Sequence, residues 1–149
     1  MKLKVLYPDS TQRFNMGGPY IGPLELNGER LDGEFLDENF VCDKEFNWYG
    51  FVRFKWRREK LKIFFGIIPW TALFRECKIL VHDTQTGDWY LSKSNWESLF
   101  VTKLSAGCIH YTEAFHNGSP ERFELKINEA NFERITESEK KLHTTPAIK

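Results

Sequence analysis

The stretch FNWYGFVRFKWRREKLKIFF (residues 46–65) contains two interleaved patterns that decide the fold. Its even positions up to 56 are apolar or small: Phe46, Trp48, Gly50, Val52, Phe54 and Trp56. Its odd positions mix polar, aromatic and basic residues: Asn47, Tyr49, Phe51, Arg53, Lys55 and Arg57. Because successive side chains of a β-strand point to opposite faces, this alternation predicts a strand over residues 46–56. We expect the even face to lie on the core and the odd face to lie in solvent.

A chain reversal over residues 57–60 and a second strand over 61–67 would complete the apolar face. That register gives the apolar pairs Trp56–Leu61, Phe54–Ile63 and Val52–Phe65, and the basic pairs Lys55–Lys62 and Arg57–Lys60. Like charges directly opposed in a sheet are mildly destabilising. We therefore expect an acidic group to compensate this basic surface.

Turn dipeptides divide the rest of the chain into short strands. They are NG at 27–28, DG at 32–33, TG at 86–87 and NG at 117–118. Such dipeptides between apolar or alternating stretches are typical of antiparallel hairpins. In LELNGERL (24–31), a two-residue turn pairs Leu24 with Leu31 and Glu25 with Arg30. The further predicted strands are 2–7, 22–26, 29–36, 77–83, 88–92, 108–115 and 121–127.

Two helices are also predicted. Ser94 and Glu97 have the spacing of a capping box, which predicts a short helix near residues 95–100. Phe132, Ile135 and Leu142 fall near one helical face, which predicts a C-terminal helix over about 129–142. The fold class is therefore mainly β, or β-rich α+β, with an antiparallel sheet built from hairpins and arranged as a sandwich or barrel.

Length and composition limit the classes of protein. A chain of 149 residues fits one domain, 1–149, whose last residues, 143–149, we expect to fray. With 21 basic and 21 acidic residues, no long-range field draws it toward a polyanion or an acidic membrane. The N-terminus lacks the apolar core of a secretory signal, and the longest apolar run, residues 63–70, is too short to span a bilayer. We expect a cytoplasmic protein.

Recognisable catalytic chemistry is sparse. The four histidines, His82, His110, His116 and His143, form no HExxH pattern, and no GxSxG or phosphate-binding loop occurs. The three cysteines, Cys42, Cys77 and Cys108, form no CxxC pair, which argues against a disulfide scaffold or a zinc site. We expect no metal and no cofactor. An enzyme that uses His110 with Cys108 or a nearby carboxylate stays as a hypothesis, since the two residues could share one strand face.

The odd face of the opening stretch is the candidate binding surface. Six cations lie between residues 53 and 62, and aromatic residues together with arginine are typical of protein interfaces. The partner-binding residues predicted on this face are Tyr49, Phe51, Arg53, Lys55, Arg57 and Arg58. An acidic second patch is predicted at Asp37, Glu38 and Asp43. The alternative is that the two charge signs simply neutralise each other within one sheet.

A small, neutral, aromatic-rich β protein with charged patches of both signs and no catalytic motif resembles the immunity proteins with which bacteria neutralise interference toxins. The resemblance extends over the whole chain and is one of composition and pattern. It implies a non-enzymatic domain whose partner is a cognate toxin. It also implies that binding is stoichiometric and occludes the toxin's active site or substrate path.

Two further functions compete with this one. A β-barrel or sandwich with many Phe and Trp side chains is able to hold an apolar ligand. Nucleic-acid binding through the basic hairpin is disfavoured, because most aromatic residues lie on the opposite face from the charges, whereas base stacking needs both on one face. The oligomeric state and the choice between sandwich and barrel are left open by the sequence.

Overall fold

The computed structural model describes residues 2–12, 19–62, 69–116, 118 and 120–135, and in these ranges the chain forms strands and no helix. The strands are β1 (Val5–Leu6), β2 (Thr11–Gln12), β3 (Tyr20–Leu26), β4 (Glu29–Cys42), β5 (Trp48–Lys62), β6 (Pro69–Asp83), β7 (Trp89–Ser92), β8 (Phe100–Ser105), β9 (Cys108–Thr112), β10 (Phe123–Lys126) and β11 (Phe132–Ile135). The mainly β, antiparallel fold class is therefore confirmed.

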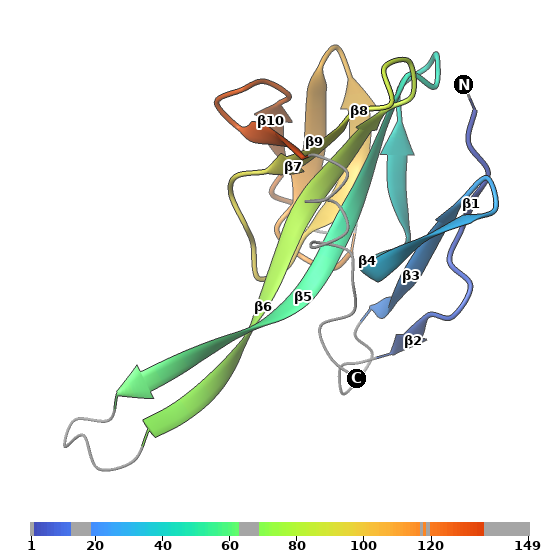
Figure 1. Cartoon of the computed structure of the whole chain (residues 1–149). Helices are drawn as coiled ribbons and strands as arrows, with labels where there is room; N and C mark the ends of the chain where they lie inside the picture. Colours follow the sequence, from blue (N-terminus) through green and yellow to red (C-terminus); the bar gives the residue numbers. More distant parts are fainter. Residues whose placement is uncertain (1, 13–18, 63–68, 117, 119, 136–149) are drawn as a thin grey trace.

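The strands form two antiparallel sheets. The large sheet has the order β1-β3-β4-β5-β6-β7-β11, with β2 paired to β3, and the small sheet has the order β10-β9-β8. The small sheet lies against the upper part of β4 and β5, and β5 and β6 continue as a long ribbon away from it (Figure 1).

Both predicted helices are wrong within the described residues. Near 95–100, the backbone of Trp96 pairs with Cys77 on β6 through hydrogen bonds of 2.7 and 2.9 Å, so this segment adds to the sheet. Residues 132–135 form β11, which pairs with β7 and buries Phe132 and Ile135. The remainder of the predicted C-terminal helix, 136–142, lies outside the described residues. In both segments, pairing with the sheet outweighs a weak local preference for helix.

The predicted hairpin at Asn27–Gly28 is confirmed with its register. Leu24 pairs with Leu31 and Glu25 with Arg30. Asn27 and Gly28 have φ angles of 50° and 85°, as a two-residue turn with both central residues left-handed requires. The DG dipeptide at 32–33 is instead inside β4, where β4 bulges opposite β3.

The reversal predicted over residues 57–60 is wrong. β5 continues to Lys62 and β6 begins at Pro69, so Trp56 lies opposite Arg75 and not Leu61. Lys55 lies opposite Glu76 and Arg57 opposite Phe74, and both like-charged pairs are thereby avoided. The predicted partners Ile63 and Phe65 lie outside the described residues. The stretch WRREKLK has none of the usual turn residues, which is the physical reason the strand continues.

The first half of β5 is buried on both faces. On one face a cluster between the two sheets contains Val52, Phe54, Cys77, Ile79, Val81, Leu99, Val101, Leu104, Ile109 and Tyr111. On the other face, the curled large sheet encloses Leu24, Leu26, Leu31, Phe35, Tyr49, Phe51, Leu80, Trp89, Leu91 and Ile135. The expectation that the odd face lies in solvent is therefore wrong for Tyr49, Phe51 and Arg53, which are all buried.

Two residues bring the sheets together. A Cβ added at Gly50 would lie 2.6 Å from Cδ1 of Ile109 on β9, so only glycine lets the sheets approach this closely. Asn39, buried where β4 is irregular, donates from Nδ2 to the Val101 carbonyl at 2.9 Å and accepts at Oδ1 from the Val101 N–H at 3.1 Å. Its side-chain amide thus pairs with β8 as a backbone peptide would.

The described part of the chain has no helix with the length and apolarity needed to cross a membrane.

Candidate functional site

The ribbon formed by residues 55–62 of β5 and 69–76 of β6, here called the arm, is the most unusual feature of the molecule. β4 pairs with β5 only up to Phe54, and no other described strand pairs with the two strands beyond that point. In Figure 1 the arm projects well away from both sheets. A two-stranded ribbon is marginally stable by itself, so the buried half of β5 and β6 must hold it in place.

One face of the arm contains a charge cluster around Glu76. Lys55 Nζ lies 3.8 Å from Glu76 Oε1, and an Arg57 guanidinium nitrogen lies 3.9 Å from Glu76 Oε2. The Arg57 guanidinium also lies over the Phe74 ring, 5.7 Å from its centroid. Glu76 is buried beside these two cations. It is an acidic group that compensates the basic surface, as expected from the sequence.

Arg53 lies at the base of this face, inside the molecule. Burial lowers its pKa, and the attraction of Glu76 opposes that shift. Its charge therefore contributes to holding the base of the arm and is not displayed to solvent.

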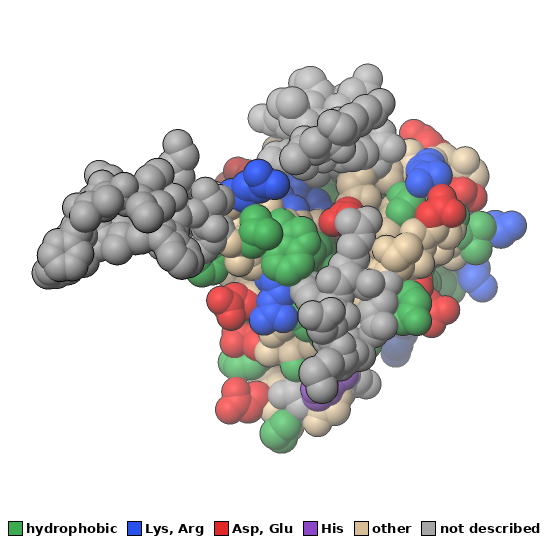
Figure 2. Space-filling view, turned by 90° about the horizontal axis from the view of Figure 1, so that it is seen from below, with side chains coloured by type: hydrophobic (Ala, Val, Ile, Leu, Met, Phe, Trp, Pro, Cys, Tyr) green, Lys and Arg blue, Asp and Glu red, His purple; other side chains and the backbone are tan. Residues whose placement is uncertain are grey.

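The opposite face combines exposed apolar and basic side chains. Trp56 is 38% exposed and Leu73 55% exposed, and their cross-strand partners are Arg75 and Arg58. Trp56 packs edge-on against Phe54 at 5.3 Å between ring centroids, and Arg75 lies 5.5 Å from the Phe115 ring centroid. Figure 2 shows apolar and basic side chains side by side where the arm meets the body. Tryptophan and arginine are the residues most enriched in binding hot spots.

The structure divides the predicted basic surface into two parts. Tyr49, Phe51 and Arg53 belong to the interior, and the Tyr49 hydroxyl accepts a hydrogen bond from the Leu3 N–H at 2.8 Å. Lys55, Arg57 and Arg58 are exposed on the arm, with Arg58 on the opposite face from the other two. Trp56, Leu73 and Arg75 were not predicted as surface residues of a ribbon, because Trp56 was expected in the core and the predicted strand 77–83 begins after Leu73 and Arg75.

The predicted acidic residues lie in two different places. Asp37 and Glu38 are at the irregular part of β4, and Glu38 has a φ angle of 55°. Burial, and then the Glu38 charge, raise the pKa of Asp37. Burial also raises the pKa of Tyr7, and the charges of Asp37 and Glu38 raise it further. Asp43 follows β4, in the turn that leads to β5.

His110, the candidate catalytic histidine, lies beside a carboxylate on the neighbouring strand. His110 Nδ1 lies 3.8 Å from Glu124 Oε2 across β9 and β10, and the Glu124 side chain is largely exposed. All three cysteines are free, and burial raises the pKa of the Cys77 thiol to about 12, which suppresses its thiolate at neutral pH. Across the described ranges, no three His, Cys, Asp or Glu side chains are grouped to hold a metal ion.

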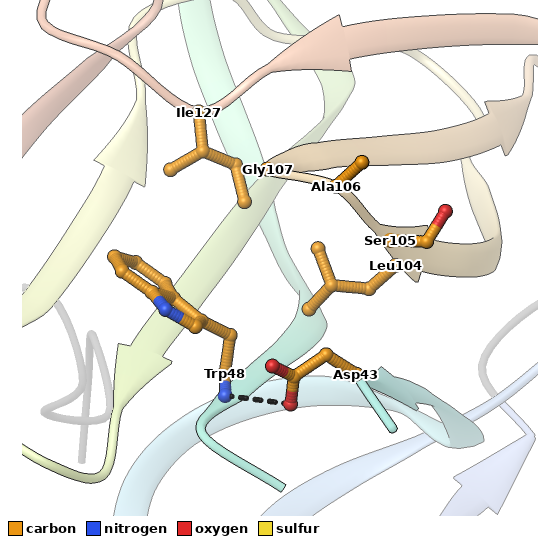
Figure 3. A pocket seen from close by; sticks show the side chains of 7 residues that line it. All are labelled: Asp43, Trp48, Leu104, Ser105, Ala106, Gly107 and Ile127. Carbon is orange, nitrogen blue, oxygen red and sulfur yellow. Dashed lines mark hydrogen bonds between the residues drawn. The ribbon is translucent and has the colours of Figure 1, made fainter. Parts of the chain in front are cut away.

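A pocket of about 290 Å³ lies at the other end of β5 from the arm. It is lined by Asp43, Trp48, Leu104, Ser105, Ala106, Gly107 and Ile127. In Figure 3 the Trp48 indole, Leu104 and Ile127 surround the hollow, and Asp43 lies at its lower end. Its size is at the small end of the range for ligand sites.

Comparisons of this chain with protein-family models, with curated proteins and with solved structures gave no match.

Proposed function

We propose that the protein is a non-enzymatic protein-binding domain that inserts its arm into an acidic, partly apolar cleft of another protein. The observation that carries this proposal is the arm itself, with Trp56 and Leu73 exposed between arginines on one face and Lys55 and Arg57 on the other. Apolar side chains grouped into one exposed patch with a polar rim are typical of interaction sites. Cations beside them favour a partner surface of negative charge.

The proposal includes the neutralisation of a bacterial toxin by stoichiometric occlusion, as immunity proteins act. The arm supports this mechanism by its length. Eight residues in each strand, at a rise of about 3.3 Å per residue, give a projection of roughly 26 Å. A projection of that length is sufficient to fill an active-site cleft. The three free cysteines agree with the reducing cytoplasm in which we place this role.

A protein partner is favoured over a nucleic acid. The whole chain has no net charge, and the cationic face of the arm contains the buried carboxylate of Glu76. Nucleic-acid affinity depends mainly on the neutralisation of many phosphates, to which an interposed carboxylate is unfavourable. An exposed leucine adds apolar area that fits a protein surface better than a phosphate backbone.

The test is a pull-down from host lysate with wild type and two double variants. The arm variant, Arg58→Glu with Leu73→Ser, changes two exposed residues that face each other across the arm. The matched control, Lys126→Glu with Leu6→Ser, makes an equal charge reversal and the same Leu→Ser change on exposed residues of β10 and β1. Both variants keep the core intact, so circular dichroism and thermal unfolding should match wild type.

We expect one partner protein that forms a one-to-one complex with wild type and with the control and that is lost from the arm variant. Calorimetry with the purified partner then gives the stoichiometry, and one equivalent of the chain should abolish the partner's activity. Equal binding by the arm variant would reject the arm as the binding surface. Capture of nucleic acid, with affinity falling steeply as salt rises, would replace the protein partner by a polyanion.

A further inference from the structure

The pocket at the start of β5 has a fixed carboxylate at one end. Asp43 Oδ1 accepts hydrogen bonds from the backbone N–H groups of Asn47, at 2.7 Å, and Trp48, at 3.1 Å (Figure 3). The backbone also closes this turn, because the Asp43 N–H donates to the Trp48 carbonyl and the Phe46 N–H to the Asp43 carbonyl. The turn therefore presents the Asp43 carboxylate in one orientation beside the hollow.

The other walls of the pocket are apolar and equally fixed. The Trp48 indole stacks on Tyr90 with 5.8 Å between ring centroids. Leu104 is buried, and the Ile127 N–H donates to the Gly107 carbonyl at 2.8 Å, which holds Ile127 against the β8–β9 turn. In Figure 3 the Ser105 hydroxyl points away from the hollow, so the pocket combines one anionic group with aromatic and aliphatic walls.

We propose that this pocket binds an alkylammonium group, as found in a lysine side chain or a free primary amine. The ammonium would form a charge-assisted hydrogen bond with the Asp43 carboxylate, and the alkyl chain would lie along Trp48, Leu104 and Ile127. An aromatic wall beside an anion is the usual arrangement for an organic cation, since the ring face attracts positive charge as well. The volume of about 290 Å³ accommodates one such chain.

This site is independent of the arm. Asp43 lies in the turn before β5 and Trp48 is the first residue of β5, whereas the arm begins at Lys55. Loss of partner binding in the arm variant therefore leaves the pocket unchanged, and the two proposals fail or succeed separately.

The test uses nuclear magnetic resonance with four probes on the full chain. Two probes are cationic, n-butylammonium and Nα-acetyl-lysine methylamide, and two are neutral controls of similar shape, n-butanol and Nα-acetyl-norleucine methylamide. The indole N–H signal of Trp48, assigned with Trp48→Phe, reports occupation of the pocket. We expect saturable shifts with at least one cationic probe and none with its neutral counterpart. Shifts with n-butylammonium alone indicate a free amine as the ligand, and shifts with both indicate a lysine side chain.

Two variants separate charge from structure. Asp43→Asn keeps an oxygen for the two backbone N–H groups but removes the charge, and should weaken binding about tenfold. Glu45→Gln, an exposed residue of the same turn outside the pocket, should bind like wild type. Equal shifts with charged and neutral probes, or unchanged affinity in Asp43→Asn, would overturn the proposal.

Discussion

The two halves of β5 differ both in their neighbouring strands and in their composition. From Tyr49 to Phe54 the strand lies between β4 and β6, with a hydrophobic cluster on each face. From Lys55 onward, β6 is the one strand among the described residues that pairs with it. Arg53 is the one basic residue from Tyr49 to Phe54, whereas five of the eight residues from Lys55 to Lys62 are basic. The position where β4 leaves β5 then decides which aromatic side chain becomes core, because Phe54 is buried between the sheets and Trp56, on the same face, is 38% exposed.

The largest expected difference between the two halves concerns Phe54 and Trp56, two residues apart on the same face. Phe54→Ala should lower the free energy of unfolding by about 3–5 kcal/mol, because it leaves a cavity between the sheets. Trp56→Ala removes a ring that is 38% exposed and should cost about 1 kcal/mol. Urea unfolding of both variants measures the difference. Similar losses would mean that the arm is packed as firmly as the core.

Gly50 provides a second test of the buried half. Gly50→Ala should lower the free energy of unfolding by about 1–3 kcal/mol, since the new methyl group meets Cδ1 of Ile109. Ile109→Val removes that atom, so the double variant should be more stable than the sum of the two single losses predicts. Strict additivity in denaturant unfolding would show that the sheets do not depend on this contact.

Glu76 marks the boundary between the halves. Glu76→Gln removes the carboxylate shared by Lys55 and Arg57 and the charge that opposes the pKa shift of Arg53, so we expect a loss of about 1–2 kcal/mol. The exposed Glu124→Gln serves as the control and should stay within about 0.5 kcal/mol of wild type. A thermal unfolding curve unchanged by Glu76→Gln would remove this cluster from the forces that hold the arm.

The smallest effect is expected at Asp37, in the irregular part of β4 between Phe35 and Phe40. Burial and Glu38 raise its pKa above 3.8, so its protonation favours the folded state. This contribution is complete below pH 3.8 and is lost as the pH rises through the folded pKa. Asp37→Asn should therefore gain about 0.5 kcal/mol or less at pH 7, because water screens the half-exposed carboxylate, and gain nothing at pH 3. Unfolding at both pH values checks the sign, and a loss at pH 7 would contradict it.

Some of this architecture is predictable from local sequence. The period of two, the turn dipeptide at Asn27–Gly28 and its register follow from short-range rules, and the structure confirms them. Tyr49 and Phe51 also supplied a signal that both faces of β5 are apolar there, which is typical of a strand covered on both sides.

Other features depend on contacts between distant segments. The arm begins where β4 ends its pairing with β5, which no local pattern specifies. The pocket is built from residues 43, 48, 104–107 and 127, so its carboxylate is far in the sequence from the walls at Leu104 and Ile127. The capping-box spacing at Ser94 and Glu97 was misleading, because the backbone of Trp96 forms its hydrogen bonds with Cys77.

The paired hydrogen bonds of Asn39 with Val101 have a consequence for the order of folding. They join residues 62 positions apart, whereas β8, β9 and β10 are consecutive in the chain and pair with one another. Closing a long loop costs more chain entropy than closing a hairpin, so the small sheet should assemble before it docks. Asn39 then favours a single alignment of β8 on β4, because a shift of β8 by one residue would remove both of its hydrogen bonds with Val101. A single buried side chain thus fixes the register in which the small sheet docks on the large sheet.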